Sequence, residues 1–195
     1  LMQELVEKTE RNLGEDFFRK HAGHFWGVVS TRPYMRARQH WGELLAETGR
    51  LPEAAAVFER MLELNPDDNQ GMRYRLLGLY LALREPEKAR RLMTRYPDEE
   101  QSSPLFAWGR VLERWLVGDL EEARAALAHA RLLNRYAERY ISGRRRLPTL
   151  PPAYYQPGND SEGQIVAREL APAWERNPGF LEWLRGGAPA GPCNI

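Results

Sequence analysis

The strongest constraint in this sequence is a repeated pattern of two amphipathic helices that begins at Pro33. Between Pro33 and Pro66, apolar residues recur at helical spacing in two blocks, which a tight turn at residues 48–50 separates. Weaker copies of the pattern follow twice along the chain. The repetition is clearest in three alanines, which lie 35 and 34 residues apart: Ala54, Ala89 and Ala123. A period of this length is typical of proteins built from stacked helix pairs.

The helix boundaries follow from the residues that start and stop helices. Proline suits the first helical turn, where its missing N–H has no partner, and glycine tolerates the left-handed conformation that ends a helix. On this basis we expect three helix pairs, over residues 34–48 and 52–64, 69–84 and 86–95, and 104–117 and 120–133. Asn134 should break or bend the last of these helices, which residues 136–141 then continue.

The repeated alanines have a physical explanation. Two antiparallel helices approach closely only where a small side chain lies at their crossing, and bulky side chains fill the space beside it. The three alanines fit the crossing points. A bulky residue follows each alanine after four positions and is expected to form the wall between pairs: Phe58, Met93 and Leu127.

The chain on either side of the repeats differs in composition. Residues 1–33 predict short N-terminal helices that act as a cap, and residues 34–143 hold the three repeats. Residues 144–160 begin with three arginines and contain the string LPTLPPAYYQPG, which we expect to be extended or polyproline-like. Residues 161–185 predict a C-terminal capping helix region that Pro172 kinks or divides. Residues 186–195 are expected to form a disordered tail.

The repeated unit resembles the tetratricopeptide repeat (TPR), in which W-x2-L-G-x2-Y is followed by A-x3-F and then P. The first pair departs from this pattern at Arg38, where the family has Trp, and matches it at Gly42, Ala54, Phe58 and Pro66. The strings TRPYMRAR and NPGFLEWL are similar to uncharacterised bacterial TPR proteins related to the suppressor-of-tumorigenicity family. The resemblance implies an all-α fold, a right-handed α-solenoid of about three TPR-like helix pairs with N- and C-terminal capping helices.

The resemblance also implies which residues line the concave surface, since in this family the first helix of each pair provides it. The candidate binding groove comprises Arg36, Gln39, Glu43, Gly71, Tyr74, Gly78, Phe106, Gly109 and Glu113. Its middle is small and apolar, and apolar surface of this kind is usually covered. Two covers are open: the chain's own residues 147–185, or a foreign peptide or helix.

Residues that suggest catalysis or metal binding are few. His21 and His24 are spaced for one helical face, but no third metal ligand lies near them. Residues 67–69 lack the spacing of a calcium loop and fit a turn with a helix N-cap. The paired carboxylates Glu99 and Glu100 are expected in a loop after Pro97. Because no phosphate-binding glycine loop or nucleophile elbow is present, we expect no enzyme, no cofactor and no metal.

Charge separates two remaining classes of function. The chain has 28 Lys and Arg against 27 Asp and Glu, so it has no overall basic excess that would attract nucleic acid or membranes. Two local arginine clusters remain, one at residues 144–146 and one made by Arg32, Arg36 and Arg38. The first is either an anion contact or a solvated helix end. The second is either an anion site or a set of ion pairs with Glu43 or Glu47.

We therefore expect a non-catalytic protein–protein interaction scaffold of TPR type that binds an unidentified protein or peptide. The alternative is an RNA- or nucleic-acid-associated adaptor that uses the arginine clusters. The single cysteine, Cys193, cannot form a disulfide within the chain, which favours a cytoplasmic location. No apolar run is long enough to span a membrane.

Overall fold

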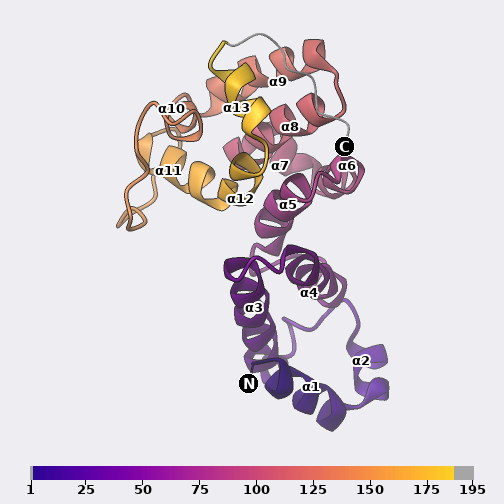
Figure 1. Cartoon of the computed structure of the whole chain (residues 1–195). Helices are drawn as coiled ribbons and strands as arrows, with labels where there is room; N and C mark the ends of the chain where they lie inside the picture. The colour runs from indigo at the N-terminus through magenta and orange to yellow at the C-terminus, as the bar shows by residue number, and fades with distance from the viewer. Residues whose placement is uncertain (1, 187–195) are drawn as a thin grey trace. The chain divides into compact units, whose positions relative to one another are not determined.

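The computed structural model describes residues 2–186, which contain α-helices, one short 3-10 helix and no strand. The expected all-α fold of packed helix pairs is confirmed. The chain divides into two compact units, one ending at Leu76 and one beginning at Leu77 (Figure 1). The predicted tail at 186–195 lies, from residue 187 onward, outside the described residues, as does Cys193.

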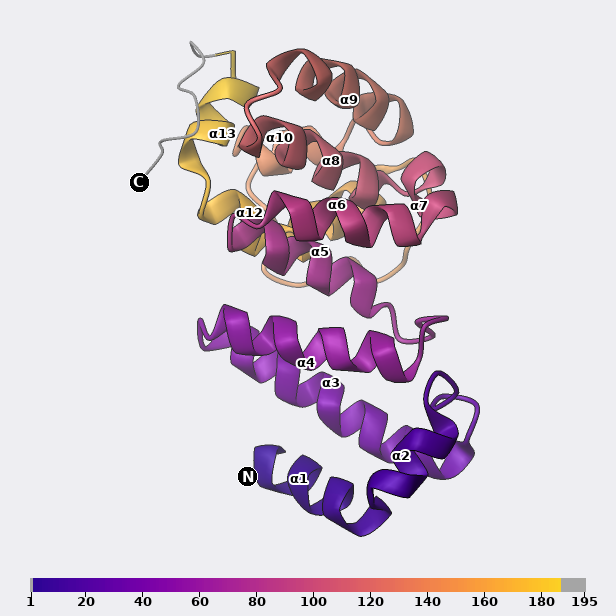
Figure 2. The same cartoon turned by 90° about the vertical axis from the view of Figure 1, so that its right-hand side faces the viewer.

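The first unit contains a predicted helix pair and the helices that precede it: α1 (Met2–Leu13), α2 (Glu15–His21), the 3-10 helix η1 (Val29–Thr31), α3 (Arg32–Glu47) and α4 (Leu51–Leu64). Helices α3 and α4 pack side by side, and α1 packs against α3 (Figure 2). The turn between α3 and α4 depends on Gly49, whose φ of 80° lies in the left-handed region. The close approach of these helices depends on Gly42, because a Cβ there would collide with the Phe58 ring.

The second unit contains the remaining helices, the first of which starts in the first unit: α5 (Met72–Ala82), α6 (Pro86–Arg95), α7 (Pro97–Ser102), α8 (Pro104–Leu116), α9 (Leu120–Leu133), α10 (Ala137–Ile141), α11 (Asp160–Glu169), α12 (Ala171–Glu175) and α13 (Pro178–Leu184). The predicted bounds of α6 and α9 are confirmed. The expected division at Pro172 is confirmed too, because α11 ends before it and Pro172 lies in the first turn of α12.

The prediction of a loop after Pro97 is wrong. Glu99 and Glu100 lie in the short helix α7, not in irregular backbone. Pro97 occupies the first helical turn, and the acidic residues that follow are favoured near the positive end of the helix dipole. The periodicity could not show α7, because the helix buries no side chain completely and so carries no apolar pattern.

The predicted crossing points lie in the core. Ala54, Ala89 and Ala123 are all 0% exposed, and the bulky residues four positions later are buried as well. Helix α8 is the centre of the second unit, packing against α6, α9 and α11, and its Phe106 and Trp108 are 0% exposed. The small-then-bulky alternation read from the sequence therefore corresponds to real helix contacts.

Candidate functional site

The first-unit part of the predicted groove is an accessible polar surface on α3. Arg36 is exposed, while Gln39 and Glu43 are half-buried. Gln39 Nε2 donates to Glu43 Oε1 at 3.0 Å, and Gln39 Oε1 accepts from Gln70 Nε2 at 2.8 Å. Arg75 reaches within 3.9 Å of Glu43 Oε1. We call these five residues the α3 strip; its amide, carboxylate and guanidinium groups are suited to hydrogen bonding with a polar partner.

Gly71 directly precedes α5, and Tyr74 lies in its first turn. Gly71 has a φ of 72°, so it serves the turn that precedes the helix. Tyr74 is half-buried, and the Arg73 guanidinium lies 4.4 Å from its ring centroid. Arg73 Nη2 also donates to the Tyr74 hydroxyl at 2.9 Å. The Tyr74 ring is therefore held by its neighbour Arg73.

The turn and capping role expected of residues 67–69 is seen at Asp68, which caps α5 from the preceding turn, although Gly71 holds the position directly before the helix. Its Oδ1 accepts from the Met72 backbone N–H at 2.7 Å, and its Oδ2 accepts from the Arg73 N–H at 2.9 Å. Burial raises the pKa of the Asp68 carboxyl, and the hydrogen bonds from Arg73 and Met72 oppose that shift without overcoming it. This carboxylate therefore organises the start of α5.

The second-unit part of the predicted groove is covered by the chain's own C-terminal helices. A Cβ at Gly78 would lie 2.9 Å from the backbone oxygen of Glu169 and 3.7 Å from Leu170 Cα. Asn177 Nδ2 donates to the Leu81 carbonyl at 3.2 Å, which fastens the segment before α13 to α5. Gly78 is therefore a contact site for α11 and α12, and no partner reaches it in this conformation.

The other apolar positions of the groove are also buried. Phe106 is 0% exposed, and a Cβ at Gly109 would come within 2.7 Å of Leu77 Cδ2. Further along α8, Trp115 packs edge-on against Phe180 of α13 at 5.8 Å between ring centroids. The sequence left two possible covers for the apolar groove. In the second unit, the chain's own residues cover it.

Glu113 is fully buried and surrounded by arginines. Its Oε1 accepts from Arg90 Nε at 2.9 Å and Arg90 Nη2 at 2.7 Å, and its Oε2 lies 3.1 Å from Arg110 Nη1 and 3.4 Å from Arg114 Nε. The hydrogen bond to Glu113 raises the pKa of Arg90. This predicted groove residue joins α6 to α8 and is an internal anchor.

The arginine cluster around Tyr34 is arranged differently from either expectation. Arg38 is 7% exposed and pairs with Glu10 of α1, not with Glu43 or Glu47. Tyr34 donates to the same Glu10 carboxylate at 2.7 Å, and burial, with lesser effects from these neighbours, raises the Tyr34 pKa. The sequence could not reveal this pairing, because Glu10 lies outside the repeats. The other two arginines of the cluster lie near the Trp26 ring instead: Arg32 at 5.3 Å and Arg36 at 6.0 Å.

The first unit also has a hollow that no sequence pattern predicted. A hollow of about 400 Å³ is lined by Glu10, Glu15, Phe18 and Arg60. Its lining mixes two carboxylates with one guanidinium, and Arg60 lies 5.8 Å from the Phe18 ring centroid. Glu10 of this lining already bonds to Tyr34 and Arg38, and Arg60 pairs with Glu63.

Residues 2–186 hold no candidate metal cluster and no candidate membrane span. Within residues 2–186, no three His, Cys, Asp or Glu side chains are grouped so that they could hold a metal ion. No helix in that part of the chain has the length and apolar character needed to cross a bilayer.

The fold and its surfaces define an α-helical protein of packed helix pairs. Residues 45–107, about a third of the chain, match the tetratricopeptide repeat family, whose members generally mediate protein–protein interactions. No curated protein and no solved structure matches the chain. The similarity to bacterial proteins related to the suppressor-of-tumorigenicity family therefore stays a prediction.

Proposed function

We propose that this protein is a non-catalytic scaffold that binds a protein or peptide partner through the α3 strip. In this proposal, residues 34–143 hold three repeats, and residues 1–33 and 161–185 cap them. The family match at residues 45–107 supports the class of function. The lone cysteine is consistent with a reducing cytoplasm as the place where the scaffold works.

One contrast between two helices carries the proposal. On α3, Arg36 is exposed, and Gln39 and Glu43 are half-buried. On α8, Phe106 and Glu113 are 0% exposed. A binding surface must be accessible, so among the predicted groove residues the α3 strip is the better candidate for recognition.

The test compares two charge reversals of the full chain. Gln39→Ala combined with Glu43→Arg changes the α3 strip, and Glu121→Arg places the same new charge on the exposed surface of α9. Each protein is used as bait in extract of the native host, and the captured proteins are quantified. We expect the α3 variant to lose partners that wild type and the control both retain. Equal capture by all three proteins would refute the role of the α3 strip.

The competing function is an adaptor for RNA or another nucleic acid, favoured by the exposed side chains of residues 144–146. Salt separates the two functions, because binding to phosphates weakens steeply as salt rises while hydrogen-bonded peptide recognition weakens less. Titration of fluorescent single-stranded RNA at two salt concentrations, with Arg144, Arg145 and Arg146 changed together to Ala, tests this function. Tight RNA binding that the triple variant loses would favour the adaptor over the scaffold.

A further inference from the structure

Arginine is concentrated around α10 in the second unit. Residues 131–146 contain six arginines and a single glutamate, whereas the whole chain has 28 Lys and Arg against 27 Asp and Glu. Two carboxylates of α11, those of Asp160 and Glu162, also contact this stretch. Positive charge therefore exceeds negative charge around α10, although the chain as a whole is nearly balanced.

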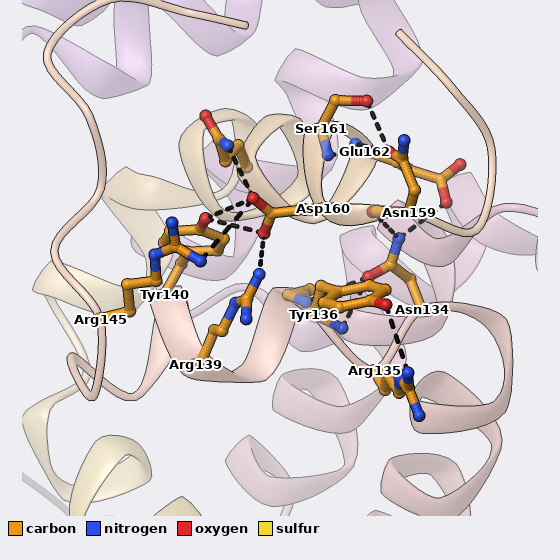
Figure 3. A network of polar contacts seen from close by, with 12 residues as sticks. Asn134, Arg135, Tyr136, Arg139, Tyr140, Arg145, Asn159, Asp160, Ser161 and Glu162 are labelled. Carbon is orange, nitrogen blue, oxygen red and sulfur yellow. Dashed lines mark hydrogen bonds and ion pairs between the residues drawn. The ribbon is translucent and has the colours of Figure 1, made fainter.

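Three of these arginines alternate with two tyrosines (Figure 3). The Arg135 guanidinium lies 5.1 Å from the centroid of the Tyr136 ring, and the Arg139 guanidinium lies 4.9 Å from the same centroid. Arg139 also lies 5.3 Å from the Tyr140 ring, which Arg145 approaches at 5.5 Å. We call these five residues the Arg-Tyr ladder. A guanidinium within about 6 Å of an aromatic ring is attracted to the ring face, so the ladder holds its guanidiniums in place.

The middle of the ladder is anchored to α11. Arg139 pairs with Asp160, and the Tyr140 hydroxyl donates to Asp160 Oδ1 at 2.8 Å. Arg145 donates its backbone N–H to the Arg139 carbonyl at 2.7 Å, which fixes the chain where it leaves α10. Because these contacts exist before any ligand arrives, binding does not have to order this part of the surface.

The ends of the ladder keep positive charge that the protein does not neutralise. Arg135 and Arg146 are exposed, and no carboxylate of residues 2–186 forms an ion pair with either of them. Arg144 and Arg145 each lie 3.9 Å from a carboxylate oxygen, and their side chains are 60% and 53% exposed. These four guanidiniums are accessible to an anionic ligand.

The ladder favours a carboxylate ligand over a nucleic acid. Proteins that bind single-stranded nucleic acid stack the bases on accessible aromatic rings. Tyr140 is 6% exposed, and Tyr136 is half-buried and contacted by two guanidiniums, so neither ring of the ladder is free to stack on a base. Guanidinium groups pair with carboxylates through two parallel hydrogen bonds. A positive surface confined to residues 131–146 therefore suits a short acidic segment.

We propose that the Arg-Tyr ladder, together with Arg144 and Arg146, docks an acidic segment of a partner protein. Aspartate or glutamate side chains of that segment pair with the exposed guanidiniums, and the tyrosine rings keep the guanidiniums oriented. Of the two roles that the sequence left open for residues 144–146, this proposal assigns the anion contact. The surface belongs to the second unit, is separate from the α3 strip and goes beyond the function proposed for that strip.

The probe is a short fluorescein-labelled peptide in which glutamate alternates with serine, titrated with the full chain and followed by fluorescence anisotropy. We expect saturable binding that weakens as salt rises, and no binding of the same peptide with glutamine in place of glutamate. Arg135→Gln combined with Arg145→Gln should weaken binding about tenfold, since two accessible guanidiniums are lost. Arg91→Gln combined with Arg124→Gln is the matched control. It removes the same charge from exposed positions of α6 and α9 and should bind as wild type.

A second variant keeps the test independent of the ladder's own stability. Arg144→Gln combined with Arg146→Gln changes exposed side chains that make no hydrogen bond within residues 2–186, and it should weaken binding about threefold or more. Circular dichroism and thermal unfolding show whether the ladder variant is folded; if it is not, the second variant alone carries the test.

A single-stranded RNA with the same number of negative charges is titrated in parallel. Tighter binding of this RNA than of the acidic peptide would assign the surface to nucleic acid and overturn the proposal. Failure of wild type to bind the acidic peptide would overturn it too, as would equal binding by wild type and the folded arginine variants.

Discussion

Replacing Glu113 tests the claim that half of the predicted groove is structural. Its carboxylate is 0% exposed and contacts Arg90, Arg110 and Arg114. Breaking a buried ion pair by removing one partner costs about 3–5 kcal/mol. The three arginine side chains are 36%, 15% and 26% exposed, so they regain some hydration when the carboxylate is lost. We therefore expect Glu113→Ala to lower the free energy of unfolding by about 2–3 kcal/mol.

The assay is thermal and urea unfolding followed by circular dichroism. A loss of this size corresponds to a melting temperature about 5–10 °C lower in a chain of this length. Glu43→Ala is the matched control, because Glu43 is a groove residue of the same type whose side chain is 23% exposed. That control should change stability by about 0.5 kcal/mol or less. If Glu113→Ala proved as stable as Glu43→Ala, the structural role of Glu113 would be wrong.

Three more predictions follow from single contacts. Gly78→Leu should lower the free energy of unfolding by about 2 kcal/mol or more, since the leucine side chain has no room against the Glu169 carbonyl. The same change should speed proteolysis of residues 144–158. The control Ala128→Leu, on the exposed surface of α9, should have neither effect. Asp68→Ala should cost about 1–2 kcal/mol through loss of the side chain that caps the start of α5, measured by urea unfolding, while exposed Asp67→Ala should be nearly neutral. Burial acts to raise the pKa of Asp160, but hydrogen bonds led by that from Arg139 outweigh it, so the pKa is lowered. Ionised Asp160 therefore stabilises the fold above its unfolded pKa of about 3.9, and this contribution is lost as pH falls through the lower folded value. Asp160→Asn should accordingly show a smaller loss of stability than wild type between about pH 6 and pH 3, and equal losses would contradict this role.

The fold was largely predictable because its signals are local. Ala54 and Phe58 reveal a helix crossing by size and spacing alone, and Gly49 reveals the turn by its backbone freedom. Contacts between residues far apart in the sequence could not be predicted. Glu10 pairs with Arg38 across 28 residues, and no pattern in the sequence links them. Helix α7 was missed for a different reason, since a short exposed helix has no apolar period.

The candidate site was less predictable. The repeat pattern predicts where a residue lies on its helix, but it does not predict which other segments cover that residue. Gly78 and Gln39 are both predicted groove positions on the first helices of their pairs. Glu169 approaches Gly78, whereas Gln39 keeps part of its surface exposed. The covering helices come from residues 160–184, which the resemblance to the repeat does not include. Burial by such a segment becomes visible only when the chain is folded.

The difference between the two helices nevertheless has a cause that lies in the sequence. Apolar surface such as that of Phe106 is costly to leave in water, so a stable chain must cover it with its own residues or with a permanent partner. Polar groups such as those of Gln39 and Glu43 lose little in water and need no cover. Where C-terminal helices cover the apolar groove positions, as they do at Gly78, the surface left accessible is therefore the polar one. This difference in the cost of exposure is why we propose the polar α3 strip, and not α8, for recognition.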